Sequence, residues 1–385
     1  MLKRLRVKNF KSLENFEVEF EKFNVLVGRN NSGKSNVIDV LSFLGEGFKD
    51  PIEKIFIRRG GYKEVVFGGN EENDIEIEAE FEVSDKQEKF LFEYYIKISG
   101  KYDAGKVIEE SIKITRNNDL PEEISDLGLF GKVAYINLPY IDSNAPKEAQ
   151  RTMKIFSKFL EMKDKVYGAF ILIFKLILQE IYIYKITPQN IKLQYPEAFI
   201  DTDSTLDKGC ENLALFLLKL SQQDKKKFER IKELLFGVVE DIDDISPTVE
   251  GKHVYLKIKD KNFDKYFYPE SISDGTISLL AYITILETIK ENAIICFEEP
   301  ENYIHMRLLE FLVDLMKNSD KQIILVTHSP YFIDWCNPED LIIVEKDSGE
   351  TKARRIKDSE EMKESLIESG LSLGESYYSD ELKNE

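Results

Sequence analysis

The feature that most constrains this chain is a stretch near its beginning that reads GRNNSGKS and spans residues 28–35. A short apolar run with strand character, residues 23–27, comes directly before it. Directly after it, apolar side chains recur at helical spacing at Val37, Ile38, Leu41 and Leu44. Its position between a strand and a helix distinguishes a phosphate-binding loop from a chance match. The pattern therefore predicts an α/β fold organised around a strand–loop–helix unit.

The residue types in this loop suit a polyphosphate ligand. Successive backbone N–H groups that lead into a helix N-terminus present fixed donors to an anion. Gly28 and Gly33 let the backbone turn without a Cβ clash, while Lys34 can reach the β- and γ-phosphates and Ser35 can hold Mg²⁺. A glycine-rich turn without a ligand is the alternative. We predict nucleotide contacts from Gly28, Arg29, Asn30, Asn31, Ser32, Gly33, Lys34, Ser35 and Asn36.

Composition narrows the function classes. The 385 residues, 42% of them hydrophobic, can build a substantial core, and the net charge of −18 repels nucleic acid and anionic membranes. Nucleic-acid contact would therefore need a local basic surface, and the short basic runs at 225–227 and 352–357 are more often solvated faces. Three widely separated cysteines and the absence of a signal peptide predict a cytoplasmic protein. The apolar segment 166–186 contains charged residues, which favours a core helix over a membrane span.

Periodicity gives a coarse order of elements. Residues 3–27 alternate as strands, and residues 75–116 predict an antiparallel meander with one wet, acidic face. Residues 146–186 and 207–236 have helical patterns, and strands return at 253–258 and 263–268.

Two continuous apolar runs in the C-terminal part suit buried parallel strands. Residues 293–297 lead into Glu298 and Glu299, and residues 322–326 lead into Thr327 and His328. Beside a nucleotide, Glu298 can complete the Mg²⁺ shell and Glu299 can polarise the attacking water. His328 can hydrogen-bond a phosphate oxygen. The alternatives are a charged turn after a core strand and a surface histidine.

A second helix start carries Ser273, Asp274, Gly275 and Thr276, followed by apolar residues at helical spacing. Ser and Gly at a helix N-terminus form another anion-binding end. Taken alone, the pattern is only a helix-capping signal.

Together these motifs resemble the ATP-binding-cassette-type ATPases of the RecF/SMC/OLD group. GRNNSGKS looks like their Walker A motif, ISDGT like their signature, ICFEEPEN like their Walker B, and LVTHSP like their switch-histidine loop. The stretches LKRLRVKNFKSLENFEVEF and GCENLA are also similar. Three departures are Glu298, where many cassettes carry Asp, Met306, where relatives often carry proline, and the lack of any Gln between Asn36 and Lys86 to form a Q-loop.

The resemblance implies an ABC-ATPase-like P-loop fold with a mixed or antiparallel N-terminal sheet, a parallel core sheet and a helical insertion. It divides the chain into residues 1–140 as the first part of the ATPase head, 141–245 as a mainly helical insertion or lid, and 246–385 as the second part of the head. The chain looks OLD-like but without a Toprim nuclease domain, because too few residues follow His328.

The resemblance also implies a soluble ATPase that sandwiches ATP and Mg²⁺ in a head-to-tail homodimer or higher oligomer. Glu299 and His328 would be catalytic, Ser35 and Glu298 would hold the metal, and Ser273, Asp274, Gly275 and Thr276 would contact the nucleotide of the other subunit. We expect a switch in DNA maintenance or anti-phage defence, acting with a separate effector. The alternatives are a nucleotide-gated scaffold or sensor with slow hydrolysis and a transporter ATPase subunit.

Overall fold

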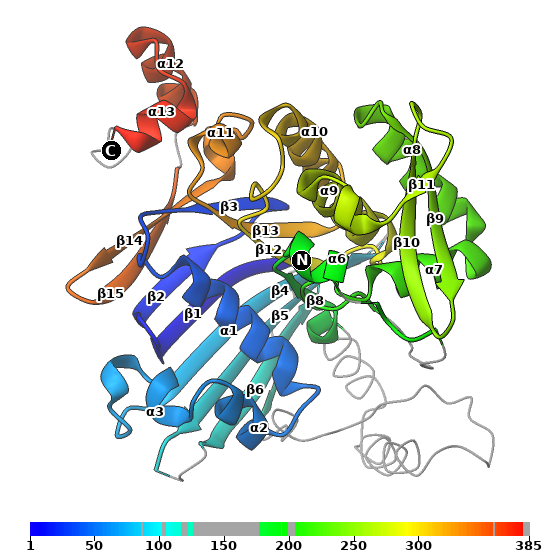
Figure 1. The fold of residues 1–385 in the computed structure, drawn as a ribbon. Coiled ribbons are helices and arrows are strands. Elements are labelled where there is room, and N and C mark those ends of the chain that lie inside the picture. The colour runs from blue at the N-terminus through cyan, green and yellow to red at the C-terminus, as the bar shows by residue number, and fades with distance from the viewer. Residues whose placement is uncertain are drawn as a thin grey trace, which may run out of the picture. The chain divides into compact units, whose positions relative to one another are not determined.

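The computed structural model describes residues 1–85, 88–101, 105–116, 122–125, 177–193, 195–198, 205–356 and 359–379. The chain divides into two compact units. The first comprises Met1–Glu21, Gly28–Tyr182 and Ile343–Arg355, and the second comprises Lys22–Val27, Ile183–Ile342 and Ile356–Glu385. Figure 1 shows the elements of both.

The first unit contains a six-stranded sheet in the order β2-β1-β4-β5-β6-β7, in which every neighbouring pair is antiparallel. Apolar residues of β4, such as Ile77 and Phe81, are fully buried, and glutamates alternate with them. This confirms the predicted meander. The strands are β1 (Leu2–Phe10), β2 (Leu13–Glu19), β4 (Ile75–Asp85), β5 (Glu88–Ser99), β6 (Lys106–Arg116) and β7 (Glu122–Ser125).

The glutamates of β4 do not form the plain acidic face that the alternation predicted. Strand β1 pairs with β4 and places a cation opposite three of its glutamates. Three ion pairs follow, namely Arg4–Glu80 at 2.8 Å, Arg6–Glu78 at 3.1 Å and Lys8–Glu76 at 3.1 Å. Cross-strand pairs of opposite charge stabilise a sheet, so this face is a ladder of alternating charges.

Helix α1 (Lys34–Gly47) lies across this sheet (Figure 1). Phe43 packs edge-on against Phe10 of β1 at 5.5 Å between ring centroids, and Phe48 after the helix contacts Tyr94 of β5 at 5.8 Å. All four apolar positions used to predict the helix are buried. The unit also contains α2 (Ile52–Arg58), α3 (Tyr62–Val65), η1 (Phe67–Gly69) and β15 (Glu350–Arg355).

The second unit contains three adjacent parallel strands, β3 (Phe23–Val27), β13 (Gln322–Thr327) and β12 (Ile294–Glu298). The ladder pairs Val27 with Thr327 and Val326 with Glu298. Almost every residue of these strands is buried, as expected for a parallel sheet covered on both faces. The predicted parallel core is confirmed.

Helices and a small sheet complete the second unit. Tyr282 of α9 packs on Phe297 of β12 at 5.3 Å between ring centroids. The helices are α6 (Pro188–Leu193), α7 (Leu213–Gln223), α8 (Lys225–Val238), α9 (Asp274–Thr288), α10 (Met306–Lys317), α11 (Pro330–Ile333), α12 (Ser359–Ser369) and α13 (Leu373–Tyr378), with η2 (Pro269–Ser271) and η3 (Pro338–Asp340). The small sheet has the order β11-β10-β9, made of Tyr266–Phe267, His253–Asp260 and Ile242–Glu250.

The middle of the chain differs in part from its sequence pattern. Most of the helix predicted over residues 146–186 lies outside the described residues, and its end is strand β8 (Ile181–Tyr184). The alternating Ile and Tyr residues of β8 suit a strand, which explains this error. Strand β9 was missed because it contains Pro247, which is tolerated at the edge of the small sheet. Strand β14 (Leu341–Asp347) joins the two units in the chain.

The sequence also bears on membrane-spanning helices and on the state of the cysteines. The described residues contain no helix that is both long and apolar enough to cross a membrane. Cys210, Cys296 and Cys336 are all buried free thiols, and burial raises the pKa of each thiol well above its ordinary value.

Candidate functional site

The loop at residues 28–35 accepts glycine alone at its two glycine positions. A Cβ on Gly28 would lie 2.1 Å from the carbonyl oxygen of Val344, and one on Gly33 would lie 2.0 Å from Oγ1 of Thr351. Gly33 also has a φ of 101°, which disfavours any residue with a side chain. The loop therefore needs both glycines for its shape, whatever it binds.

Lys34 is folded back over this loop. It is the first residue of α1, is 7% exposed, and its Nζ donates to the carbonyl oxygens of Gly28 at 2.7 Å and Arg29 at 3.0 Å. Asn31 has a φ of 67°, so the loop backbone is also strained there. The ammonium of Lys34 thus sits inside the curve of the loop.

A buried polar cluster supports the loop from behind, and sequence reasoning missed it. Thr351 of β15 donates to the carbonyl oxygen of Ser32 at 2.9 Å and shares a hydrogen bond with Ser12 at 2.6 Å. Asn36 donates to the Ser12 hydroxyl at 2.6 Å. The Ser32 hydroxyl is buried and has no hydrogen-bond partner among the described residues. It is a polar group within the loop that a bound anion could satisfy.

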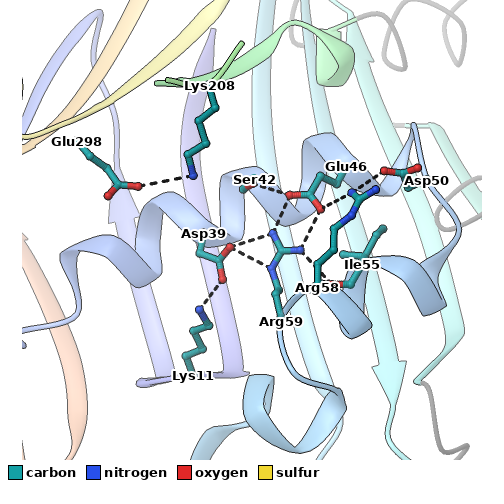
Figure 2. A network of polar contacts seen from close by, with 10 residues as sticks. All are labelled: Lys11, Asp39, Ser42, Glu46, Asp50, Ile55, Arg58, Arg59, Lys208 and Glu298. Atoms are coloured by element: carbon teal, nitrogen blue, oxygen red, sulfur yellow. Dashed lines mark hydrogen bonds and ion pairs between the residues drawn. The ribbon is translucent and has the colours of Figure 1, made fainter. Parts of the chain in front are cut away.

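The helix that follows the loop is fixed by a partly buried ion network (Figure 2). The side chain of Arg59 is only 8% exposed. Its guanidinium contacts the carboxylates of Asp39 at 2.9 Å and Glu46 at 3.0 Å, both on α1. Lys11 approaches the other oxygen of Asp39 at 2.7 Å. Burial alone would raise the pKa of Asp39, but Arg59 and Lys11 outweigh it and hold this pKa below its usual range.

The carboxyl ends of the three parallel strands share one edge of the second unit's sheet. Residue Val27 ends β3 and the glycine-rich loop begins with the next residue, while Glu298 ends β12 and His328 directly follows β13. In open α/β sheets, ligands bind outside the carboxyl ends of the strands. Three of the predicted motifs therefore start from the same edge.

Glu299 and His328 are neighbours at this edge. Nδ1 of His328 lies 3.6 Å from Oε1 of Glu299, and both side chains are more than a third exposed. Asn302 donates to the other oxygen of Glu299 at 2.8 Å, and the backbone N–H of Glu299 donates to the carbonyl of Val326 at 2.8 Å. Glu299 has a φ of 49°. Such strain in a residue other than glycine concentrates at functional sites.

Glu298 faces two ammonium groups. Nζ of Lys185 lies 3.1 Å from one carboxylate oxygen and Nζ of Lys208 lies 3.9 Å from the other, and the Glu298 side chain is 17% exposed. The carboxylate thus already receives cations in this structure, which fits a divalent metal. No cluster of three or more metal-ligating side chains occurs in the described ranges. Mg²⁺ suits such a sparse site because it commonly uses one or two carboxylates together with phosphates.

Glu301 lies behind these residues and was not predicted as part of the site. Thr327 donates to Oε1 of Glu301 at 2.6 Å, whereas Oε2 is buried with no partner in the described part of the chain. Burial raises the pKa of this carboxyl. Its position two residues after Glu299 was the only sequence signal. By holding Thr327, it fixes the backbone next to His328.

The predicted motif at residues 273–276 opens helix α9, as expected. The Ser273 hydroxyl caps the helix by accepting from the backbone N–H of Thr276 at 3.1 Å. A Cβ on Gly275 would lie 2.7 Å from the carbonyl oxygen of Tyr303, so the helix start packs closely against the segment after Glu299. The cap is therefore explained by local packing, and its predicted contact with a nucleotide stays a prediction.

Asp274 already has partners on α6. Lys192 lies 2.5 Å from its carboxylate, and Gln189 donates to it at 2.8 Å. Its negative charge is thus partly neutralised at the start of α9.

Comparison with known proteins places the chain in a family. Residues 23–127 and 200–334, more than half of the chain, match the family described as "AAA domain, putative AbiEii toxin, Type IV TA system". A protein of Helicobacter pylori named "ATP/GTP phosphatase" is 42% identical over 45 residues. That stretch covers 11% of this chain and 12% of the relative.

Among solved structures, the chain is similar to an SMC head bound to the C-winged helix domain of ScpA, with a TM-score of 0.53 and 15% identity over 94% of this chain and 99% of that one. An SMC head domain from Thermotoga maritima has a TM-score of 0.45 and 16% identity over 92% of this chain and 99% of that one. The first similarity confirms the predicted fold, which this chain shares with an SMC head. By its sequence match, the chain belongs to the AAA-domain family whose description names a putative AbiEii toxin of a type IV TA system.

Proposed function

We propose that this protein is an ATPase that binds ATP through the loop at residues 28–36 and hydrolyses it with Glu299. The observation that carries the proposal is the shared edge of β3, β13 and β12, from which the loop, the Glu298–Glu299 pair and His328 all start. The strained backbone of Glu299 and the unpartnered hydroxyl of Ser32 support it. The name of the Helicobacter relative, "ATP/GTP phosphatase", supports nucleotide hydrolysis as the activity.

The proposed reaction is phosphoryl transfer to water. The water oxygen attacks the γ-phosphorus, the bond to the bridging oxygen breaks, and ADP and inorganic phosphate leave. Glu299 orients the water and accepts its proton, while His328 donates a hydrogen bond to a γ-phosphate oxygen. Lys34 and the loop N–H groups offset the charge of the phosphates.

Mg²⁺ fits the residues present. Ser35 and Glu298 would hold it, and when bound it would neutralise charge on the phosphate oxygens. The two lysines that contact Glu298 show that this carboxylate accepts positive charge in the folded chain.

The direct test is a turnover assay with ATP and Mg²⁺. We expect Lys34→Ala to abolish binding or turnover while circular dichroism stays unchanged, because the Lys34 ammonium faces the loop, where it donates to the backbone carbonyls of Gly28 and Arg29. Lys252 is an exposed lysine outside the loop, and Lys252→Ala provides the matched control. ATP affinity and rate that match the parent in Lys34→Ala would exclude the nucleotide site.

We further propose that two subunits sandwich ATP head to tail, with Ser273 to Thr276 of one facing the phosphates held by the other. The capped N-terminus of α9 is a favourable site for an anion. Ser273→Arg should block an ATP-dependent dimer by crowding the phosphate, whereas Ser273→Thr preserves the cap and should dimerise. Light scattering with and without ATP–Mg²⁺ measures this, and a Ser273→Arg protein that still dimerises on ATP would contradict the sandwich.

The biological role proposed is a switch in anti-phage defence or DNA maintenance that acts on a separate effector. The family description, which names a toxin of a toxin–antitoxin system, supports defence and a second protein. A scaffold or sensor with slow hydrolysis is the competing function, and the turnover assay separates the two.

A further inference from the structure

Two lysines from segments far apart in the sequence converge on Glu298. Lys185 directly follows β8 and reaches Oε2, and Lys208 lies in the turn before α7 and reaches Oε1. Both carboxylate oxygens are therefore engaged by a cation. The backbone N–H of Lys185 also donates to the carbonyl of Lys208 at 2.9 Å, which ties the two segments together.

The turn that carries Lys208 is braced. The side chain of Asn212 accepts from the backbone N–H of Asp207 at 3.0 Å and donates to the carbonyl of Thr205 at 2.9 Å. Cys210, which follows within the turn, is buried and has a φ of 61°. Lys208 thus projects from a fixed backbone. The segment of Lys185 is held as well, because the ring of Tyr184 before it packs near Phe297 of β12, with 6.1 Å between ring centroids.

The single carboxylate of Glu298 faces two ammonium groups, and this excess of positive charge affects the binding of a metal ion. Glu298 is 17% exposed, so its carboxylate is partly desolvated and gains more from each ammonium than a surface acid would. The two lysine side chains are about 60% exposed, which leaves them free to swing away. A divalent ion that takes an oxygen of Glu298 must repel or displace both ammonium groups.

We propose that Lys185 and Lys208 form a cationic clamp on Glu298 that competes with the divalent metal. The inference rests on the proposed function, since it takes Glu298 as a metal ligand. The lysines thereby set the affinity of the site for free metal.

The test measures binding of Mn²⁺ to the full chain without nucleotide, by electron paramagnetic resonance, so it needs no turnover. Surface ion pairs contribute up to about a fivefold change each, so Lys185→Met with Lys208→Met should bind Mn²⁺ roughly three- to tenfold more tightly than the parent. The Arg double variant keeps both charges and should match the parent. Lys252→Met, which removes a comparably exposed lysine from its ion pair with Glu197, should change nothing.

The outcomes separate the two proposals. The clamp is supported if the double Met variant binds Mn²⁺ more tightly than the parent and if adding Glu298→Gln to that variant removes the gain in affinity. If Glu298→Gln weakens binding but the lysine variants do not alter it, the clamp is wrong and the metal site stands. If Glu298→Gln leaves Mn²⁺ binding at the parent level, Glu298 is not a ligand, and both the clamp and this part of the proposed function are overturned.

Discussion

Replacing Glu299 with Gln should reduce ATP turnover by a factor of about 10² to 10⁴ while leaving ATP binding intact. Gln keeps the size and the hydrogen bond from Asn302 but cannot accept a proton from water. Catalysis of phosphoryl transfer rests on positioning and charge stabilisation, so loss of one such group leaves the nucleotide site otherwise complete. Phosphate release measures the rate, and a fluorescent ATP analogue measures binding.

A matched variant guards against a general effect of losing one negative charge. Glu310 is an exposed glutamate of α10, and Glu310→Gln should hydrolyse ATP at the parent rate. The trapped Glu299→Gln protein should also accumulate as an ATP-dependent dimer in light scattering. Hydrolysis at the parent rate by Glu299→Gln would show that Glu299 is not the base, even if ATP binding is normal.

The parts of the site that lie next to one another in the sequence could be predicted. The strand–loop–helix unit around Lys34 has local signals, because glycine spacing and helical periodicity act over a few residues. The runs that became β12 and β13 were equally clear, since parallel strands covered on both faces are apolar throughout. Their parallel pairing then sets Glu298 beside Val326, two residues before His328, at one edge.

Contacts between distant segments could not be predicted in the same way. Ser12 and Thr351, which support the loop, are 339 positions apart, and neither has a pattern of its own. Lys185 and Glu298 are 113 positions apart. A lysine directly after a strand carries no periodic signal, so its pairing with Glu298 depends wholly on the tertiary fold.

The charged face of the first sheet shows the same limit. The glutamates of β4 gave a correct strand prediction but a wrong surface, because the cations that pair with them come from β1, about 70 positions earlier. Likewise Arg59 lies in a stretch that gave no regular pattern, although its guanidinium connects two carboxylates of α1. Periodicity predicts on which face of an element a side chain lies, but it does not predict which residue the side chain contacts there.

Arg59→Met should therefore destabilise the protein by roughly 2–4 kcal/mol, because removing one partner of a buried ion pair leaves the others desolvated without compensation. Asp39 and Glu46 would lose their contacts of 2.9 and 3.0 Å, and Lys11 and Arg58 would replace them only in part (Figure 2). Urea unfolding at neutral pH measures the change. Arg230→Met removes an exposed arginine with a helical ion pair of 3.8 Å and should alter stability by less than about 0.5 kcal/mol.

The pH dependence of unfolding shows whether the stability lost in Arg59→Met comes from its ion pairs. Burial would raise the pKa values of Asp39 and Glu46, yet Arg59 and neighbouring groups hold both below their ordinary values. Carboxyl groups with lowered folded-state pKa values add stability above their unfolded pKa, near 4, and lose it as the pH falls through the folded value. The gap between the parent and Arg59→Met should hence narrow below pH of about 4. A gap that stays constant with pH would assign the loss to the cation–π contact of the Arg59 guanidinium with the Phe43 ring instead.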